Sequence, residues 1–144
     1  MSLSLIILFS IKVPKEITHI KKLKECESLL NDFYEVCKEG MKEKLATVLF
    51  QFPPSYVFSR EKLETIIGSL NYNFQNVIEF RHQSWWNVEV WNSFKENKIV
   101  EKLLALEEKL EYLNADFTLP YVAKKIKTNT TYLSYVVNKR FGKS

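Results

Sequence analysis

Three short apolar segments alternate with amphipathic segments through the first two thirds of the sequence. Residues 5–13, 45–52 and 77–82 have the length of strands, and polar and apolar side chains alternate in the second of them. Between these segments, residues 19–45 and 59–70 carry apolar side chains at helical spacing. Alternation of this kind is typical of right-handed βαβ units on a parallel sheet. The sequence therefore predicts an α/β fold with three parallel strands.

Proline and capping residues mark the ends of these elements. Pro14 and Pro53 follow the first two strands, and a proline has no N–H to donate to a strand ladder. Ser59 is suited to cap the second helix, and Asn87 is suited to cap a short helix after the third strand. We expect the order β, α, β, α, β, α.

Composition and the apolar start indicate the class of protein. A chain of 144 residues with 46% hydrophobic and 26% charged residues is typical of one ordinary globular domain. The apolar start has neither a basic leading region nor a small-residue cleavage site, and it is shorter than a membrane span. Cys26 and Cys37 have no metal-ligand spacing and are expected to be free thiols. We therefore expect a cytoplasmic protein without a membrane partner.

Polar side chains collect near the carboxyl ends of the three predicted strands. If the apolar side of each strand faces the helices, then Lys12, Gln51 and the pair Glu79 and Arg81 face the other side. Carboxyl ends of parallel strands meet at one edge of a sheet, where α/β enzymes carry their sites. This edge is the predicted location of a small-molecule site.

The predicted site combines groups that can bind and polarise an anionic or carbonyl substrate. The candidate catalytic residues are Glu79, Arg81 and His82, with the imidazole as general acid or base. The candidate ligand-binding residues are Lys12, Gln51 and Trp85, with the indole as a stacking wall.

Each assignment has a structural alternative. Glu79 and Arg81 can form an ion pair that fills a barrel interior, and Trp85 with Trp86 can belong to the core. His19 is expected to cap or pack near the first helix rather than to act in the site. The sequence has no phosphate-binding glycine loop, nucleophile elbow or metal-ligand spacing. No cofactor and no metal are expected.

Three motifs also carry a family resemblance. Residues 9–19 (FSIKVPKEITH), 49–54 (LFQFPP) and 79–86 (EFRHQSWW) resemble, in order, the signatures of the family catalogued as domain of unknown function seventy-two. The resemblance covers about residues 8–100 and implies a TIM-barrel-like fold without an established activity. Members of that family have an earlier strand and several later ones, so the resemblance implies a partial barrel here.

A different pattern begins at residue 98. A long amphipathic segment is followed by a short predicted helix capped by Thr118 and a second one capped by Asn129 or Thr130. Ala123 is small enough for a close helix crossing, and the layout is that of a helix-turn-helix. Residues 117–144 resemble the first helix-turn-helix of an AraC-type transcriptional regulator, and the preceding helix resembles the lead-in segment of such regulators.

The charge distribution favours a polyanionic partner for this segment. Residues 98–144 hold nine basic and five acidic residues, so the whole net charge of +4 lies there. A recognition helix would present polar side chains to bases, while basic side chains would contact phosphates. The alternative is a basic helical hairpin that only caps the sheet. The candidate DNA-binding residues are Lys127, Thr130, Thr131, Ser134, Tyr135, Asn138, Lys139, Arg140 and Lys143.

We interpret the chain as a fusion of two partial modules. Residues 1–97 are predicted to form a partial TIM-barrel-like domain and residues 98–144 a partial AraC-type helix-turn-helix. The expected function is small-molecule binding at the strand ends, and the alternative is weak DNA binding through residues 118–144. Unpaired strands at the edges of the sheet also predict self-association.

Overall fold

The computed structural model describes residues 7–108 and 117–142. It divides into two compact units, Met1–Asn87 and Val88–Ser144, each of which is described by itself. Among the described residues, no helix combines the length and the apolar character needed to cross a bilayer.

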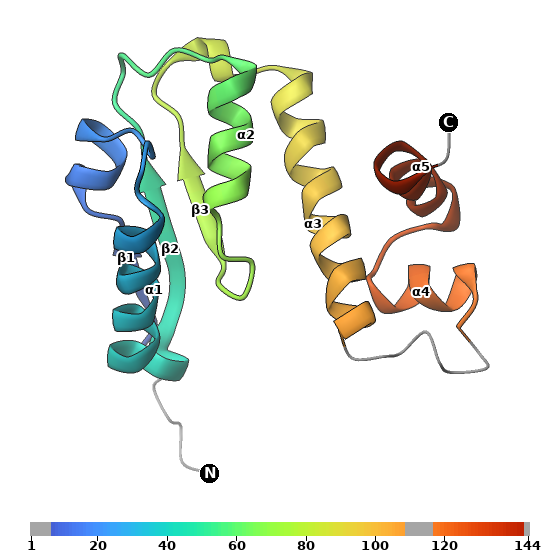
Figure 1. Ribbon diagram of the computed structural model, residues 1–144. Coiled ribbons are helices and arrows are strands. Elements are labelled where there is room, and N and C mark those ends of the chain that lie inside the picture. The colour runs from blue at the N-terminus through green and yellow to red at the C-terminus, as the bar shows by residue number, and fades with distance from the viewer. Residues whose placement is uncertain (1–6, 109–116, 143–144) are drawn as a thin grey trace. The chain divides into compact units, whose positions relative to one another are not determined.

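The first unit contains a parallel sheet with the strand order β1-β2-β3 (Figure 1). The strands are β1 (Phe9–Lys12), β2 (Leu45–Gln51) and β3 (Asn76–Glu79). Lys12 lies opposite Leu49 and Gln51 lies opposite Glu79, so the carboxyl ends of the strands are close together. The three parallel strands that the sequence predicts are confirmed.

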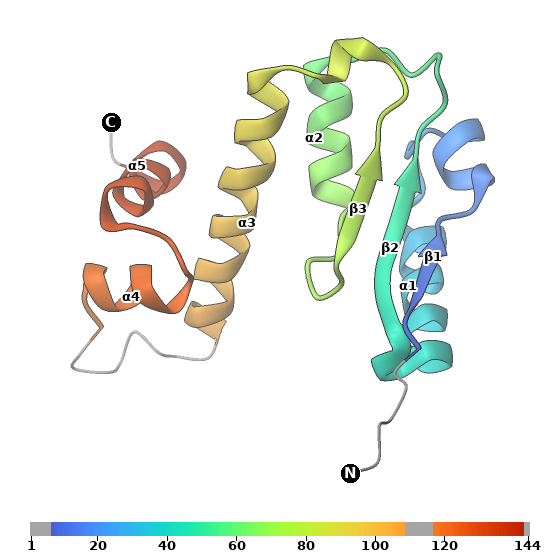
Figure 2. The same cartoon turned by 180° about the vertical axis from the view of Figure 1, so that it is seen from behind.

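Helices α1 (Glu27–Met41) and α2 (Arg60–Ser69) cover one face of this sheet. Seen from behind, in Figure 2, the strands lie in front of α1, and no described helix of this unit covers that face. The side chains toward the helices form the core, since Val48, Phe50 and Phe52 are fully buried. The alternation along β2 therefore separates a buried apolar face from a face without helices, as the sequence predicts.

The first helix begins later than its periodicity predicts. A single π-helical turn at Glu16–Ile20 follows β1, and Lys22, Leu23 and Glu25 then have positive φ angles between 49° and 63°. A left-handed backbone cannot continue a right-handed helix. It turns the Leu23 side chain into the core, where only 4% of it is exposed. Burial of that leucine thus interrupts a helical pattern that looks continuous in the sequence.

The capping predictions are confirmed at three helices. The side-chain oxygen of Ser59 accepts a hydrogen bond from the Lys62 amide at the start of α2. Thr118 caps α4 (Leu119–Lys125), and Asn129 caps α5 (Thr130–Phe141) in the same way. Each cap satisfies an amide that has no partner within its own helix, which fixes where the helix begins.

An aromatic stack closes the first unit beyond the carboxyl ends of the strands. The Trp85 ring stacks on Phe80 with centroids 4.2 Å apart and on Tyr56 at 5.5 Å, and Phe58 meets it edge-on. Its indole N–H donates to the carbonyl of Tyr56 at 2.6 Å. Only 2% of Trp85 is exposed, whereas the neighbouring Trp86 is 79% exposed. The two adjacent tryptophans therefore have opposite structural roles.

The second unit consists of α3 (Val88–Glu108), α4 and α5. The sequence predicts a short helix from Asn87 and a separate one from residue 98, but α3 runs through that position as one helix. The predicted end of the second of these, at residues 114–116, lies outside the described residues. The core of the unit is an apolar cluster contributed by all three helices: Val100, Leu106, Val122, Ala123, Ile126, Leu133 and Val136.

A short turn joins α4 to α5. Lys127 in this turn has φ 59°, the left-handed conformation that allows a sharp change of chain direction. Gly142 follows α5 with φ −61°, so it is not a left-handed cap. A Cβ at that position would lie 2.0 Å from the Asn138 carbonyl oxygen, and this close approach is what favours glycine there.

Candidate functional site

Four predicted site residues form a continuous row across the carboxyl ends of the strands. We call Lys12, Gln51, Glu79 and Arg81 the polar row. The Lys12 ammonium donates to Gln51 Oε1, and Gln51 Nε2 donates to both carboxylate oxygens of Glu79 at 3.0 Å. Arg81 Nε donates to Glu79 Oε1 at 3.0 Å. The row therefore connects all three strands through side chains on the face that the helices leave open.

The charged groups of the polar row are accessible from solvent and have donors left to bind a ligand. The Arg81 and Glu79 side chains are 44% and 43% exposed, so the row is accessible. Arg81 uses Nε for Glu79, and its two terminal nitrogens make no hydrogen bond to any other described residue. The terminal edge of a guanidinium group matches the two oxygens of a carboxylate or phosphate. Lys12 adds a second positive charge. With Glu79 as the single negative charge, the row has a net charge of plus one.

Glu79 is held as a carboxylate by its neighbours. Its hydrogen bond from Arg81, followed by that from Gln51, lowers the pKa of Glu79 below the ordinary value of 4.5. The positive charges of Arg81 and Lys12 act in the same direction. Glu79 is thus an orienting acceptor at neutral pH and is not suited to donate a proton.

We predict that Arg81→Ala raises the pKa of Glu79 toward 4.5, because the largest cause of the depression is removed. A carbon-13 titration of the Glu79 carboxyl signal measures this. Because the folded-state pKa is the lower one, the stabilisation is complete above the unfolded-state pKa and is lost as the pH falls through the folded-state pKa. Gln51→Ala should give a smaller rise, and an unchanged Glu79 titration in Arg81→Ala would contradict the ion pair.

His82 lies beside the row in sequence, but its ring is engaged by its own loop. Its Nδ1 accepts the Ser84 amide N–H at 3.1 Å and lies 2.8 Å from Ser84 Oγ. Ser84 Oγ in turn accepts the Phe58 amide. A neutral ring with an accepting Nδ1 carries its proton on Nε2, so His82 can offer a donor to a ligand. Its expected role as a general base is not favoured by this tautomer.

His19, for which the sequence predicts a capping or packing role, has an electrostatic environment that includes the polar row. It lies in the π-helical turn after β1, and its Nδ1 is 2.9 Å from the hydroxyl of buried Thr18. Burial and the positive charges of Lys15, Lys12 and Arg81 lower the pKa of His19. It therefore lies within the electrostatic range of the polar row. In the sequence, the feature that could have indicated this is the position of His19 shortly after the first predicted strand.

Trp85 does not have the geometry of a ligand wall. The Trp85 ring packs against Phe80 and Tyr56 and is only 2% exposed, so a substrate ring has no free indole surface to stack on. We therefore assign Trp85 to the core, in place of the predicted ligand contact. The stack lies next to the row because Phe80 separates Glu79 from Arg81 in the chain.

The candidate DNA-binding residues of α5 divide into two groups. Thr130, Thr131, Asn138 and Arg140 are exposed, as is Lys127 in the preceding turn, and Ser134 is half-buried. Tyr135 and Lys139 instead turn toward α3: the Lys139 ammonium pairs with Glu96 at 2.9 Å, and the Tyr135 hydroxyl donates to Glu96 at 3.4 Å. These two side chains are already engaged within the unit. Lys143 lies outside the described residues.

Three parallel strands, helices on one face and polar side chains at the carboxyl ends define a partial barrel-like α/β protein. The chain belongs to the family described as protein of unknown function DUF72, whose model matches residues 7–136. This match runs across the predicted boundary at residue 97 and includes most of residues 98–144. The comparisons do not support the AraC-type resemblance that the sequence suggests for that segment.

A solved structure supports the same assignment. The chain is similar to the crystal structure of a DUF72 family protein (TM1631) from Thermotoga maritima MSB8, with 28% sequence identity and a TM-score of 0.55. The match covers 62% of this chain and 36% of that one, so the chain spans about a third of the length of this solved relative. No curated protein matches the chain.

Proposed function

We propose that the polar row is part of a binding site for a small anionic or carbonyl-bearing molecule. Arg81 would hold the anion with its terminal nitrogens, Lys12 would add a second positive charge, and His82 would donate from Nε2. Glu79 and Gln51 would keep the two cations in place. The observation that carries the proposal is the continuous chain of hydrogen bonds from Lys12 through Gln51 and Glu79 to Arg81.

The exposure and the orientation of the charged groups support a binding role for the polar row. The exposed ion pair between Arg81 and Glu79 contributes little to the stability of the fold, because water screens it. Hydrogen bonds from a charged donor to a ligand contribute about 1.5–3 kcal/mol. A fixed guanidinium group, already oriented by Glu79, loses little conformational freedom when a ligand binds.

A thermal-shift screen of small carboxylates, phosphates and carbonyl compounds tests this function. A ligand of the row should stabilise the unmodified chain and lose roughly ten- to a hundredfold in affinity in Arg81→Ala, the range expected for a charged hydrogen bond. Lys24→Ala, which removes an exposed lysine elsewhere in the first unit, is the matched control. The proposal fails if every compound stabilises Arg81→Ala as much as it stabilises Lys24→Ala.

A second candidate function is weak DNA binding by the second unit. It is favoured by three features together: Ala123 of α4 is buried in the apolar cluster shared with α5, the chain turns sharply at Lys127, and α5 has exposed polar residues. Residues 117–142 contain no acidic side chain. Because few phosphates can be reached, binding would be weak and salt-sensitive, on the order of 10⁻⁴ to 10⁻⁶ M.

Titration against duplex DNA at two salt concentrations tests this second function. Lys127→Ala and Arg140→Ala should each weaken binding and reduce the salt slope by about one. Lys139→Ala should have a smaller effect, because Glu96 already pairs with this lysine. An affinity that does not change with salt, or that falls equally in Lys24→Ala, would exclude phosphate recognition by the second unit.

A further inference from the structure

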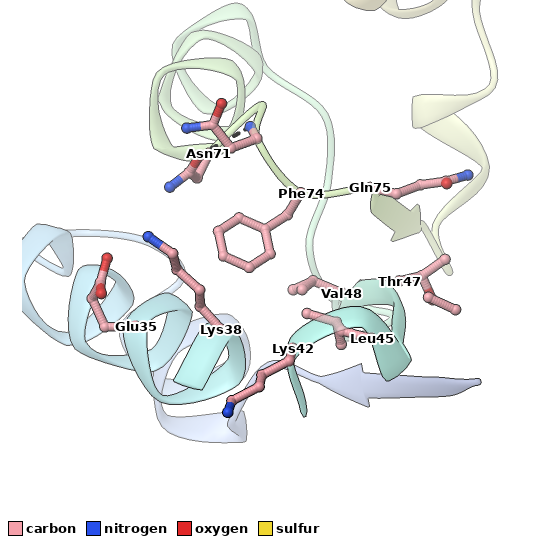
Figure 3. Close-up of a pocket in the computed structure, with 11 residues that line it drawn as sticks. Glu35, Lys38, Lys42, Leu45, Thr47, Val48, Asn71, Phe74 and Gln75 are labelled. Atoms are coloured by element: carbon pink, nitrogen blue, oxygen red, sulfur yellow. Dashed lines mark hydrogen bonds between the residues drawn. The ribbon is translucent and has the colours of Figure 1, made fainter. Parts of the chain in front are cut away.

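A groove of about 630 Å³ lies at the amino-terminal end of β2, away from the polar row (Figure 3). The last turns of α1 form one wall, the first four residues of β2 form the floor, and the turn at residues 71–75 forms the other wall. Its volume is within the range of about 300–1,000 Å³ found for small-molecule pockets.

Hydrogen bonds from α1 and Asn76 hold the wall formed by residues 71–75. The buried Tyr34 hydroxyl of α1 donates to Asn76 Oδ1 at 2.7 Å. Asn76 Nδ2 donates to the carbonyls of Asn71 and Phe74 at 2.8 and 3.2 Å, and the Gln75 carbonyl accepts the Val48 amide. The Phe74 ring packs on Tyr34 with centroids 4.7 Å apart. The groove is thus pre-formed, which lowers the entropic cost of binding.

The lining of the groove combines an aromatic ring with unused donors. In Figure 3 the Phe74 ring lies between α1 and β2, and the Lys38 side chain extends from α1 alongside it. The side chains of Lys38, Lys42, Asn73 and Gln75 make no hydrogen bond to another described residue. Among the lining residues, Lys38 and Lys42 outnumber the single carboxylate, Glu35, so the lining itself carries a net positive charge.

We propose that this groove binds a small planar aromatic anion, an aryl phosphate or aryl carboxylate. The ring of the ligand packs beside Phe74 and over Leu45, which are both half-buried, and its anionic group meets the Lys38 ammonium. Lys42 at the rim and the side-chain amides of Asn73 and Gln75 complete the donor set. Nothing in this proposal depends on the polar row, which lies at the other end of the strands.

The test is a titration of the full chain with phenyl phosphate, monitored by two-dimensional NMR. We expect saturable shifts of the amide signals at residues 45–48 and 71–75, with weaker binding of inorganic phosphate and of benzyl alcohol. Lys38→Ala should lower the affinity about tenfold, because it removes the main charge contact. Phe74→Leu keeps an apolar side chain against Tyr34 but removes the planar surface, and should also weaken binding.

Two controls separate this site from the alternatives. The affinity is read only from the amide signals at residues 45–48 and 71–75, which distinguishes the groove from the polar row, whose ligands would shift residues 79–82. Lys24→Ala should leave this affinity unchanged. The proposal is overturned if the shifts are confined to residues 79–82. It is also overturned if Lys24→Ala weakens binding as much as Lys38→Ala does, or if inorganic phosphate binds more tightly than phenyl phosphate. If Lys38 only stabilises the carboxyl end of α1, its substitution changes stability without changing affinity, and this result also overturns the proposal.

Discussion

Trp85→Ala is expected to lower the free energy of unfolding of the first unit by about 3–5 kcal/mol. The substitution removes a side chain that is 2% exposed and stacks on Phe80 and Tyr56. It also leaves the Tyr56 carbonyl without the indole N–H that it accepts at 2.6 Å. Urea unfolding followed by circular dichroism measures the change, since this signal does not depend on the tryptophan itself.

Trp86→Ala is the matched control. Its side chain is adjacent in sequence and 79% exposed, so the free energy of unfolding should change by no more than about 0.5 kcal/mol. Equal losses in the two variants would contradict the assignment of Trp85 to the core. The comparison also bears on the polar row, because the stack includes Phe80, which lies between Glu79 and Arg81.

Leu133→Ala is expected to destabilise the second unit by about 2–5 kcal/mol. Leu133 is 1% exposed and lies in the apolar cluster shared by α3, α4 and α5. A cluster of this size has little stability to spare, so the amide signals of residues 117–142 should lose dispersion. Two-dimensional NMR and the helical signal in circular dichroism report the result.

Thr131→Ala provides the comparison on the same helix. Thr131 is exposed, and its replacement should leave the dispersion of these signals unchanged. If DNA binding is present, Leu133→Ala should abolish it together with the fold, whereas Thr131→Ala should affect only the affinity. Preserved amide dispersion in Leu133→Ala would contradict the shared core of the three helices.

Local sequence patterns were sufficient to predict several parts of the fold. The alternation in residues 45–52 placed Val48, Phe50 and Phe52 on the buried face, because successive side chains of a strand point to opposite sides. Ser59 and Asn129 marked the starts of two helices, because a side-chain oxygen is the nearest acceptor for a free amide at that position. These features depend only on neighbours in the chain.

The polar row was predictable for a related reason. Lys12, Gln51 and Glu79 each occupy the same face near the end of a predicted parallel strand, and parallel strands align their carboxyl ends. The roles of the adjacent residues were not predictable. Whether Trp85 faces a ligand or the core depends on Tyr56 and Phe58, which come from a different loop.

The second unit shows the same limit on a larger scale. Asn87 and the pattern from residue 98 suggested two helices, yet α3 continues through residue 97. The charge pattern placed Lys139 on a phosphate-binding surface, but Glu96 of α3 binds it. Neither outcome can be predicted from a short stretch of sequence, because each depends on which helices pack together.

The sequence by itself therefore determined the alternation of strands and helices, the caps and the shared face of the polar row. Only the tertiary structure decided that Trp85 is buried and Trp86 exposed, that His82 is bound by its own loop, and that His19 lies within range of Arg81. The physical reason is the range of the interactions. Backbone geometry and capping act within a few residues, whereas burial and electrostatic environment are set by segments that meet only when the chain has folded.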